Sequence, residues 1–559
     1  MFVSLNALFT VTGGAISANE ATTDGGGIYN GGTLTISGGT ISDNTATNGG
    51  GIYNGGTLKM SAGTVGGNTA SGEGGGVYNS GTMFMYGSAV IGDSSKTTTA
   101  TESSYSNKGD GIRVIGTVYL GYSDSSTTAL LTGGIFYNQG AGISILNGTA
   151  VINSGSISYN CGRGVYVGSN DYAKYGTFTM NGGTISENVI TNSNGAGIYA
   201  GYHGKVSMNG GTISDNTALN GIDEEGNLTN GDGGGVAIAN TLSSFTMTGG
   251  TISGNTARRN GGGFYLGSNA FTMSGGTISG NLATTGNGIY INDGTFTMSG
   301  LALISSDNDT YLASGKYITV GSTLSESTAA TIHPASYTEG NSAISLASGS
   351  STTLDKEYYK FAIASESDGT EWGLNSEGKL QKQKTLNPSD SADITDPSIP
   401  YIIKGSSSVN NAQIDINNNV TTSTDSTYYI TLDNVKRNAT QWASALIIYN
   451  RNAGTTVTVY ITLIGENKLV GYNHGGLKLS GTSGANINVI FLTPSSGSIS
   501  FDDSYSGSDL RIENVTGTFS IASDCSFSGT SGGTIYPDFN SFFNAAQTST
   551  SGSSFTLTK

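Results

Sequence analysis

The pattern of apolar, polar and glycine positions repeats along the first half of the chain about every 25 residues, a period typical of solenoid repeats. Each repeat contains three short phrases, of which the first is Gly-Gly-Thr-Ile-Ser-x-Asn. The second phrase, Gly-Gly-Gly-Ile-Tyr-Asn, lies between copies of the first phrase at Gly25–Asn30 and Gly49–Asn54. A third phrase, such as Thr33–Ile36, completes the unit. The first phrase itself, Gly-Gly-Thr-Ile-Ser-x-Asn, recurs at Gly38–Asn44, Gly182–Asn188, Gly210–Asn216, Gly249–Asn255 and Gly275–Asn281.

Each phrase has the alternation of a short β-strand. Leu34 and Ile36 share one face of the strand, whereas Thr33 and Thr35 share the other. Three such strands, separated by glycine turns, describe one coil of a β-helix, which buries its apolar face only by stacking on neighbouring coils. The sequence therefore predicts an all-β fold, a parallel β-helix, and parallel strand crossovers favour the right-handed form.

The asparagine that ends the first phrase is predicted to be structural. An inward amide can donate a hydrogen bond to one neighbouring coil and accept one from the other, and asparagine tolerates a left-handed turn conformation. Leaving such an amide unpaired would cost about 1–3 kcal/mol. The predicted ladder comprises Asn19, Asn44, Asn68, Asn188, Asn216, Asn255 and Asn281.

Tyrosine follows the inward isoleucine of the second phrase, so it is expected to point outward. These residues predict a partial aromatic stripe along one outer face, either a stacked ladder that stabilises the sheet or a platform for sugar rings or a protein partner. The predicted stripe comprises Tyr29, Tyr53, Tyr78, Tyr166, Tyr199, Tyr265 and Tyr290.

The phrases fade after Ile304. We expect parallel β-helix repeats over residues 1–305, then irregular terminal coils and a small β cap over 306–385, because the exposed end of a solenoid core needs capping. Residues 386–400 are rich in proline and polar residues and predict a linker. Residues 401–559 contain further short strands with Gly, Asn and Asp turns, and predict a second β-helical or β-rich domain.

Charge limits the partners of the chain. Only 11% of the residues are charged and the formal net charge is −16. This composition argues against nucleic acid and against a polybasic membrane patch, both of which need clustered Lys and Arg. The apolar runs are too short for a transmembrane segment. A low-charge chain rich in Ser, Thr, Asn and Gly is typical of secreted or surface-displayed proteins.

The ends of the chain show no targeting signal. Residues 1–10 lack the basic segment and apolar core of a signal peptide. The chain is therefore interpreted as a fragment, or as one whose start lies internally. The cysteines, Cys161 and Cys525, are expected to be unpaired thiols, mostly buried.

Candidate chemistry is sparse. His203, His333 and His474 lie in unrelated segments and are expected to be solvated or turn residues. The acidic run 223–225 predicts a solvated loop, with calcium binding together with Asp232 as the alternative. No catalytic residue, metal or other cofactor is expected, although a polysaccharide lyase or hydrolase is the rival class, because β-helices carry such activities on grouped carboxylates and basic residues.

The pairing of Gly-Gly-x-Ile with Ile-x-x-Asn resembles the repeats of polymorphic outer membrane proteins and other autotransporter-like bacterial adhesins. Gly13-Gly14-Ala15-Ile16 matches their Gly-Gly-Ala-Ile motif closely, whereas Ile41 or Val65 stands where their second motif has Phe. The resemblance covers roughly residues 10–305 and implies a pectin-lyase-like β-helix at the outer membrane. Residues 400–530 are similar to carbohydrate-binding-type β-helical domains of bacterial surface proteins, which implies sugar binding.

These observations lead to a functional expectation. We expect a structural or adhesive protein, extracellular or on the bacterial cell surface, that binds glycans or surface proteins. A passive stalk and an ice-binding array are further alternatives, the latter because outward hydroxyl pairs recur in the first phrase. These pairs are Thr40/Ser42, Thr184/Ser186, Thr212/Ser214, Thr251/Ser253 and Thr277/Ser279. Ligand identity and oligomeric state are not predicted.

Overall fold

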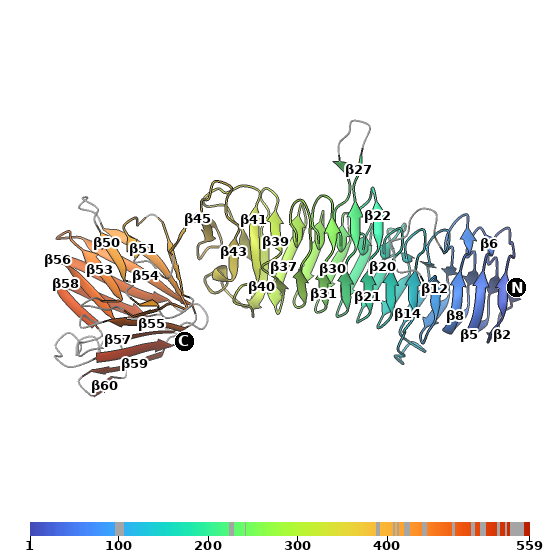
Figure 1. Cartoon of the computed structure of the whole chain (residues 1–559), viewed down its shortest axis with the longest axis horizontal. Helices are drawn as coiled ribbons and strands as arrows, with labels where there is room; N and C mark the ends of the chain where they lie inside the picture. Colours follow the sequence, from blue (N-terminus) through green and yellow to red (C-terminus); the bar gives the residue numbers. More distant parts are fainter. Residues whose placement is uncertain are drawn as a thin grey trace. The chain divides into compact units, whose positions relative to one another are not determined.

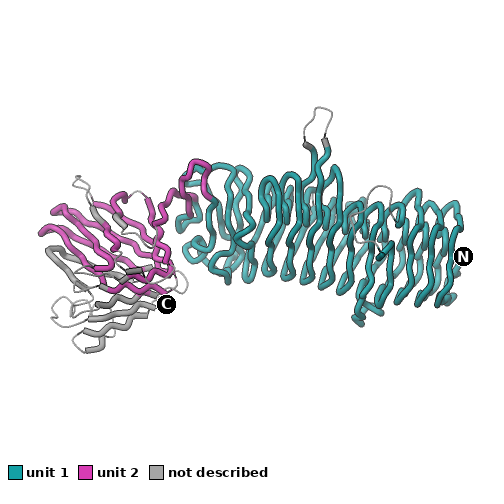
Figure 2. Tube along the Cα trace, viewed as in Figure 1, with its two compact units in different colours: residues 1–364, 374–379 teal, residues 365–373, 380–559 magenta. Residues whose placement is uncertain are grey.

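In a computed structural model, the chain forms two compact units (Figure 2). Unit 1 comprises Met1–Ala364 with Leu374–Lys379, and unit 2 comprises Ser365–Gly373 with Leu380–Lys559. The structure describes residues 1–95, 106–222, 228–240, 242–386, 392–397, 399–405, 409–410, 413–418, 425–438, 444–464, 466–471, 476–492, 498–503, 510–521, 526–531, 534–536 and 553–558.

Unit 1 is a right-handed parallel β-solenoid, as the repeat predicted (Figure 1). Each regular coil contributes one strand to each of three parallel sheets, here called sheets A, B and C. Sheet A holds the Ile-Tyr-Asn strands, and each of its strands pairs in parallel with that of the next coil. Its order is β1 (Phe2–Val3), β4 (Ile28–Asn30), β7 (Ile52–Asn54), β10 (Val77–Asn79), β13 (Ile112–Val114), β16 (Ile143–Leu146), β19 (Val165–Gly168), β23 (Ile198–Ala200), β29 (Val236–Ile238), β33 (Phe264–Leu266), β36 (Ile289–Ile291), β39 (Asp309–Leu312), β41 (Ala330–Pro334) and β43 (Phe361–Ile363).

Sheet B holds the third phrase of the repeat. Its strands alternate between buried apolar and outward polar residues, as in β5, where Leu34 and Ile36 are buried. Its order is β2 (Leu8–Val11), β5 (Thr33–Ser42), β8 (Thr57–Gly66), β11 (Thr82–Met85), β14 (Thr117–Leu120), β17 (Thr149–Ile152), β20 (Gly176–Met180), β24 (Gly204–Met208), β30 (Ser244–Met247), β34 (Ala270–Met273), β37 (Thr295–Gly300), β40 (Ile318–Leu324) and β42 (Ile344–Leu346).

Sheet C holds the Thr-Ile-Ser strands. The long strands β5 and β8 run through sheet B and continue into sheet C, with a shift of register at the corner. The other strands are β3 (Ala15–Ser17), β12 (Val90–Gly92), β15 (Gly134–Phe136), β18 (Ser156–Ser158), β21 (Thr184–Ser186), β25 (Thr212–Ser214), β31 (Thr251–Ser253), β35 (Thr277–Ser279) and β38 (Leu303–Ile304).

The glycines of the second phrase have two different roles at the corner before sheet A. Gly233, the first of its triplet, has φ +67°, a left-handed conformation that glycine adopts without strain. Gly235, the third, needs space rather than a special φ. A Cβ atom on Gly235 would lie 2.6 Å from the carbonyl oxygen of Gly263 and 2.9 Å from Ile252. The triplet therefore allows close approach of successive coils.

The solenoid continues past residue 305, where irregular coils were predicted. Strands β39, β41 and β43 extend sheet A, while β40 and β42 extend sheet B. Two short 3₁₀ turns, Leu354–Lys356 and Tyr358–Lys360, lie between β42 and β43. Lys360 forms a buried ion pair of 3.0 Å with Glu357, the residue between the two turns, and also donates to the carbonyl oxygen of Leu324.

Unit 2 is β-rich, which agrees with the predicted second β domain. Most of its strand pairs are parallel, whereas the last strands of its second sheet pair antiparallel. The predicted linker, residues 386–400, includes β47 (Ala392–Ile394), which pairs in parallel with β50 (Ile414–Asn418), so that part of it belongs to a sheet. One sheet also contains β46 (Lys384–Leu386), β48 (Tyr401–Lys404), β51 (Ser426–Asp433), β53 (Leu446–Asn450), β54 (Thr456–Ile464), β56 (Leu477–Leu492) and β58 (Leu510–Ile521). A second contains β49 (Val409–Asn410), β52 (Lys436–Asn438), β55 (Glu466–Gly471), β57 (Ser498–Asp503), β59 (Ser526–Ser531), β60 (Thr534–Tyr536) and β61 (Ser553–Thr558).

Candidate functional site

The predicted asparagine ladder is present inside unit 1. In a typical step, the Nδ2 and backbone N–H of Asn216 donate to Oδ1 of Asn255 at 2.9 and 3.0 Å, and Nδ2 also donates to the carbonyl oxygen of Ile185. Each amide thereby links three coils. The ladder contains Asn19, Asn44, Asn68, Asn107, Asn138, Asn160, Asn188, Asn216, Asn255, Asn281 and Asn308.

The left-handed turn beside the ladder differs from the prediction. The asparagine does not adopt it; the residue before it does, as at Asp43 with φ +58°, Glu187 with φ +56° and Asp215 with φ +57°. The residue with positive φ must precede the asparagine, because the change of chain direction at that residue turns the asparagine side chain inward. A second amide ladder was missed: Asn30, Asn54 and Asn79 of sheet A are buried and bonded in series.

The predicted tyrosine stripe lies on the outer face of sheet A as one column. Successive rings stack at 4.9 Å between Tyr29 and Tyr53 and at 5.1 Å between Tyr53 and Tyr78. The strand register places these residues in the column, in order: Phe2, Tyr29, Tyr53, Tyr78, Arg113, Ser144, Tyr166, Tyr199, Ala237, Tyr265, Tyr290, Tyr311 and His333.

Stacking decides what the tyrosines can bind. A ring inside a continuous stack, such as Tyr53, has both faces covered by its neighbours and presents only its edge and hydroxyl outward. Uncovered ring faces are therefore found where the column is interrupted. It is interrupted twice, by Arg113 with Ser144 and by Ala237.

The interruption at Ala237 is closed. The side chain of Ala237 is fully buried, and its strand lies between the strands that carry Tyr199 and Tyr265. Burial, followed by the carboxylate of Asp232, raises the pKa of Tyr265 to about 12. Ala237 therefore presents no exposed surface to a ligand.

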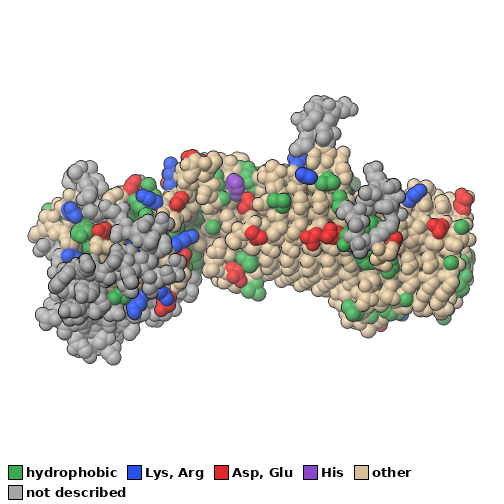
Figure 3. Space-filling model, viewed as in Figure 1, with side chains coloured by type: hydrophobic (Ala, Val, Ile, Leu, Met, Phe, Trp, Pro, Cys, Tyr) green, Lys and Arg blue, Asp and Glu red, His purple; other side chains and the backbone are tan. Residues whose placement is uncertain are grey.

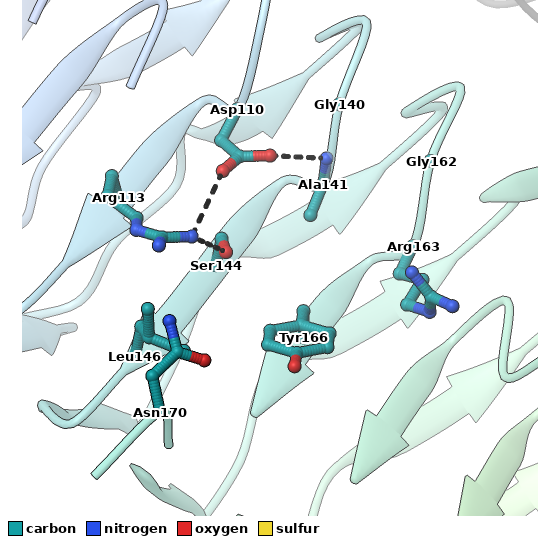
Figure 4. A pocket seen from close by; sticks show the side chains of 10 residues that line it. All are labelled: Asp110, Arg113, Gly140, Ala141, Ser144, Leu146, Gly162, Arg163, Tyr166 and Asn170. Carbon is teal, nitrogen blue, oxygen red and sulfur yellow. Dashed lines mark hydrogen bonds and ion pairs between the residues drawn. The ribbon is translucent and has the colours of Figure 1, made fainter. Parts of the chain in front are cut away.

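The interruption at Arg113 and Ser144 is open and forms a pocket of about 440 Å³ (Figure 4). Tyr199 stacks on one face of the Tyr166 ring at 6.0 Å, while Ser144 occupies the preceding column position, so no ring of the column covers the other face. The lining comprises Asp110, Arg113, Gly140, Ala141, Ser144, Leu146, Gly162, Arg163, Tyr166 and Asn170.

A hydrogen-bonded charge network forms one wall of this pocket. Arg113 donates to Oε1 of Glu73 at 2.6 Å and to Oγ of Ser144 at 2.8 Å, and lies 4.0 Å from Oδ2 of Asp110. Oδ1 of Asp110 accepts a hydrogen bond from the backbone N–H of Ala141. Nε of Arg113 is buried without a hydrogen-bond partner in the described part of the chain. The network holds the polar groups of the wall in place.

Burial of Asp110 gives a testable pH effect. Burial, only partly offset by Arg113, raises the pKa of Asp110. A carboxyl group whose pKa rises on folding destabilises the folded chain as the pH increases from the ordinary pKa through the raised one. Asp110→Asn keeps an oxygen for Ala141 and removes the ionisation. We expect its melting temperature to exceed that of the wild type at pH 7 and to equal it at about pH 3, measured by circular dichroism.

Asp293 provides the control of opposite sign. Its carboxylate accepts a hydrogen bond from Lys316 at 2.7 Å, which lowers its pKa. Asp293→Asn should therefore give no gain in melting temperature at pH 7. A melting temperature for Asp110→Asn at or below that of the wild type at pH 7 would contradict the prediction.

The other predicted candidates do not join this pocket. His203 lies in a turn but is buried rather than solvated, and packs against Tyr202 and Tyr175. His333 continues the aromatic column next to Tyr311. The acidic run 223–225, His474 and Cys525 lie outside the described residues, and Cys161 is partly exposed.

Asp232, suggested as a calcium ligand, instead accepts hydrogen bonds from Asn260 and lies 3.6 Å from Arg259. Within the described ranges, no group of three or more His, Cys, Asp or Glu side chains is arranged to hold a metal ion.

The predicted hydroxyl pairs on sheet C are in register over four successive coils, from Thr184/Ser186 to Thr277/Ser279. Thr40/Ser42 is separated from them, because Val90 and Gly134 occupy the positions between. The hydroxyl array is therefore shorter than the sequence suggested. Much of the visible face of unit 1 is neither hydrophobic nor charged (Figure 3).

Comparison with protein-family models, with curated proteins and with solved structures finds no match to this chain. Among the residues that the structure describes, no helix is long and apolar enough to cross a membrane.

Sequence reasoning found the tyrosines of the pocket but missed its polar wall. The signal was present in the second phrase, which reads Gly-Ile-Arg-Val at residues 111–114 and Gly-Ile-Ser-Ile at 142–145. Aligning these segments with Gly-Ile-Tyr-Asn places Arg113 and Ser144 at the tyrosine position. Asp110 and Arg163 belong to the turns before sheet A, where residue type varies from coil to coil.

Proposed function

We propose that this chain is an adhesive β-solenoid that binds glycans at the interruption of its tyrosine column and is displayed outside a bacterial cell. One observation carries the proposal: an open pocket beside a tyrosine ring with an uncovered face. The volume, about 440 Å³, is within the usual range of small-ligand sites. An apolar ring face beside fixed polar groups suits a sugar, whose C–H face packs on tyrosine while its hydroxyls form hydrogen bonds.

The polar groups of the wall support this proposal. Asp110 and Ser144 offer oxygen acceptors, and Asn170 offers an amide that both donates and accepts. Since Arg113 is already bonded to Glu73 and Ser144, the wall keeps its geometry before the ligand arrives. A preorganised site loses less entropy on binding than a flexible one.

The location outside the cell is part of the proposal. The low share of charged residues and the resemblance to repeats of polymorphic outer membrane proteins and autotransporter-like adhesins support it. In unit 2, Tyr429 and Tyr460 stack at 5.1 Å, and Tyr429 is 51% exposed. This pair is our candidate for the sugar contact implied by the resemblance of residues 400–530 to carbohydrate-binding-type domains.

We propose binding without cleavage. A glycosidase needs two carboxyl groups that are free to act on the scissile bond as acid and as base or nucleophile. The two carboxylates of the polar wall are held by Arg113, with Glu73 at 2.6 Å and Asp110 at 4.0 Å. Release of reducing or unsaturated ends from oligosaccharides incubated with the protein would support the enzyme alternative instead.

Two tyrosine variants test the site. Tyr166→Leu removes the uncovered ring face, and we expect it to weaken oligosaccharide binding about ten-fold, measured by a glycan array followed by calorimetry. Tyr53→Leu is the matched control in the same column. It should leave binding unchanged while it lowers the free energy of unfolding by about 1–3 kcal/mol, because two stacked ring pairs are lost.

The outcomes separate the two roles of the tyrosines. Equal loss of binding in both variants would show that the whole column, rather than its interruption, is the binding surface. No binding of any arrayed glycan to the full chain would overturn the proposal and favour a passive stalk.

A further inference from the structure

Arg163 differs from Arg113, the other arginine at the pocket, in its hydrogen-bond partners. Its Nε donates to the carbonyl oxygen of Asn194 at 3.1 Å, and Nη2 donates to Oγ of Ser193 at 2.5 Å. Both partners are uncharged. Within the described part of the chain, no carboxylate forms an ion pair with Arg163. Since a guanidinium group has five N–H donors, others remain for a ligand.

The remaining contacts of Arg163 hold it beside the tyrosine rings. Its guanidinium carbon lies 4.4 Å from the ring centre of Tyr199 and 5.7 Å from that of Tyr166. Burial lowers the pKa of Arg163, although arginine remains protonated at neutral pH. A partly desolvated cation is thus fixed on the Tyr199 side of the Tyr166 ring, where it lines the pocket.

Arg113, on the opposite side of the pocket, shows the contrast. Its charge is balanced by Glu73 and Asp110. The pocket therefore has one arginine that forms ion pairs and one that forms none, on which the carboxylate of Asp110 acts only at longer range. An anionic group on the ligand would form an ion pair with this second arginine, and hydrogen bonds between ionised partners are roughly twice as strong as neutral ones.

We infer that the pocket selects sugars that carry an anionic group, a carboxylate or a sulfate, which Arg163 binds while the sugar ring packs on Tyr166. This inference rests on the proposed glycan binding. Ser144 and Asp110 lie across Tyr166 from Arg163 (Figure 4), where they would bind the neutral hydroxyls of the same sugar. The ionised form of Asp110 repels a second negative charge, so the anionic group is directed to the Arg163 side.

The experiment compares three oligosaccharides with the full chain by calorimetry: a galacturonic acid tetramer, a sulfated galactose tetramer and a neutral galactose tetramer. We expect at least one anionic tetramer to bind about ten-fold or more tightly than the neutral one. Arg163→Gln should remove this preference. Arg258→Gln, at an exposed arginine of the same unit, is the matched control and should preserve it.

A second measurement does not depend on the variant. Affinity of the wild-type chain for the preferred anionic tetramer should fall as sodium chloride is raised, while affinity for the neutral tetramer stays constant. Binding of the galacturonic acid tetramer would identify the anionic group as a carboxylate, and binding of the sulfated galactose tetramer would identify it as a sulfate.

The possible outcomes distinguish a failure of the anionic selectivity from a failure of glycan binding itself. Equal affinity for all three tetramers, lost in Tyr166→Leu, overturns the anionic selectivity and keeps glycan binding. A preference for anionic tetramers that persists in folded Arg163→Gln overturns the role of Arg163. No binding of any tetramer overturns both.

Discussion

Replacing Asn216 with leucine is expected to lower the free energy of unfolding of unit 1 by about 3–5 kcal/mol, because several buried polar groups lose their partners at once. Oδ1 of Asn216 accepts hydrogen bonds from the backbone N–H and Nδ2 of Asn188, and its own Nδ2 donates to Asn255 and Ile185. Leucine can replace none of these. Urea denaturation followed by circular dichroism measures the loss, and hydrogen exchange shows whether coils adjoining residue 216 open first.

Asn209 is the matched control for this variant. It is exposed, and its Nδ2 donates to Oδ1 of Asn181 at 2.9 Å, so it makes the same kind of bond between coils in contact with water. Asn209→Leu should change the free energy of unfolding by less than about 0.5 kcal/mol. Similar effects of the two substitutions would mean that the buried ladder contributes no more than a surface amide pair.

Replacing Gly235 with alanine is expected to destabilise unit 1 by about 1–3 kcal/mol, the usual cost of overpacking. The added Cβ would lie 2.6 Å from the carbonyl oxygen of Gly263 and 3.0 Å from Nδ2 of Asn255, a member of the ladder. Backbone atoms cannot move aside without separating two coils. Thermal unfolding and urea denaturation of the variant provide the measurement.

Gly13 shows what the same substitution does without the contact. A Cβ on Gly13 would meet nothing within 4 Å, and its φ lies outside the left-handed region. Gly13→Ala should be neutral or stabilising by up to about 1 kcal/mol, because alanine restricts the unfolded chain. If Gly235→Ala were as harmless as Gly13→Ala, the glycine triplet would not be required for the close approach of coils.

The fold could be predicted because each coil repeats the residue pattern of the coil before it. An inward Ile41, an outward Thr40 and Ser42 and the turn before Asn44 recur at a constant spacing, and identical spacings place identical residues in register. The residues of the ladder followed from the same reasoning. The backbone conformation beside the ladder could not be predicted in this way. The chain direction after a turn depends on which residue adopts positive φ, and that residue is Asp43 rather than Asn44.

The pocket could be predicted only in part. The tyrosines around it belong to the repeat, whereas the pocket exists because Arg113 and Ser144 depart from it. Whether a departure opens a space depends on the neighbouring turns. Ala237 also replaces a tyrosine, yet it is buried. That difference arises from contacts between coils distant in sequence, which no single repeat unit contains.

The asparagine ladder also has a direction along the solenoid. From Asn19 to Asn281, each Nδ2 donates to Oδ1 of the asparagine in the next coil. At Asn44 the backbone N–H donates to the same oxygen of Asn68, so a single oxygen satisfies two donors of the preceding coil. Asn308 ends the series, since its Nδ2 donates to the carbonyl oxygens of Asn281 and Asp307, although sheets A and B continue beyond it. The ladder therefore has a polarity, with its linking donors directed toward the C-terminal coils.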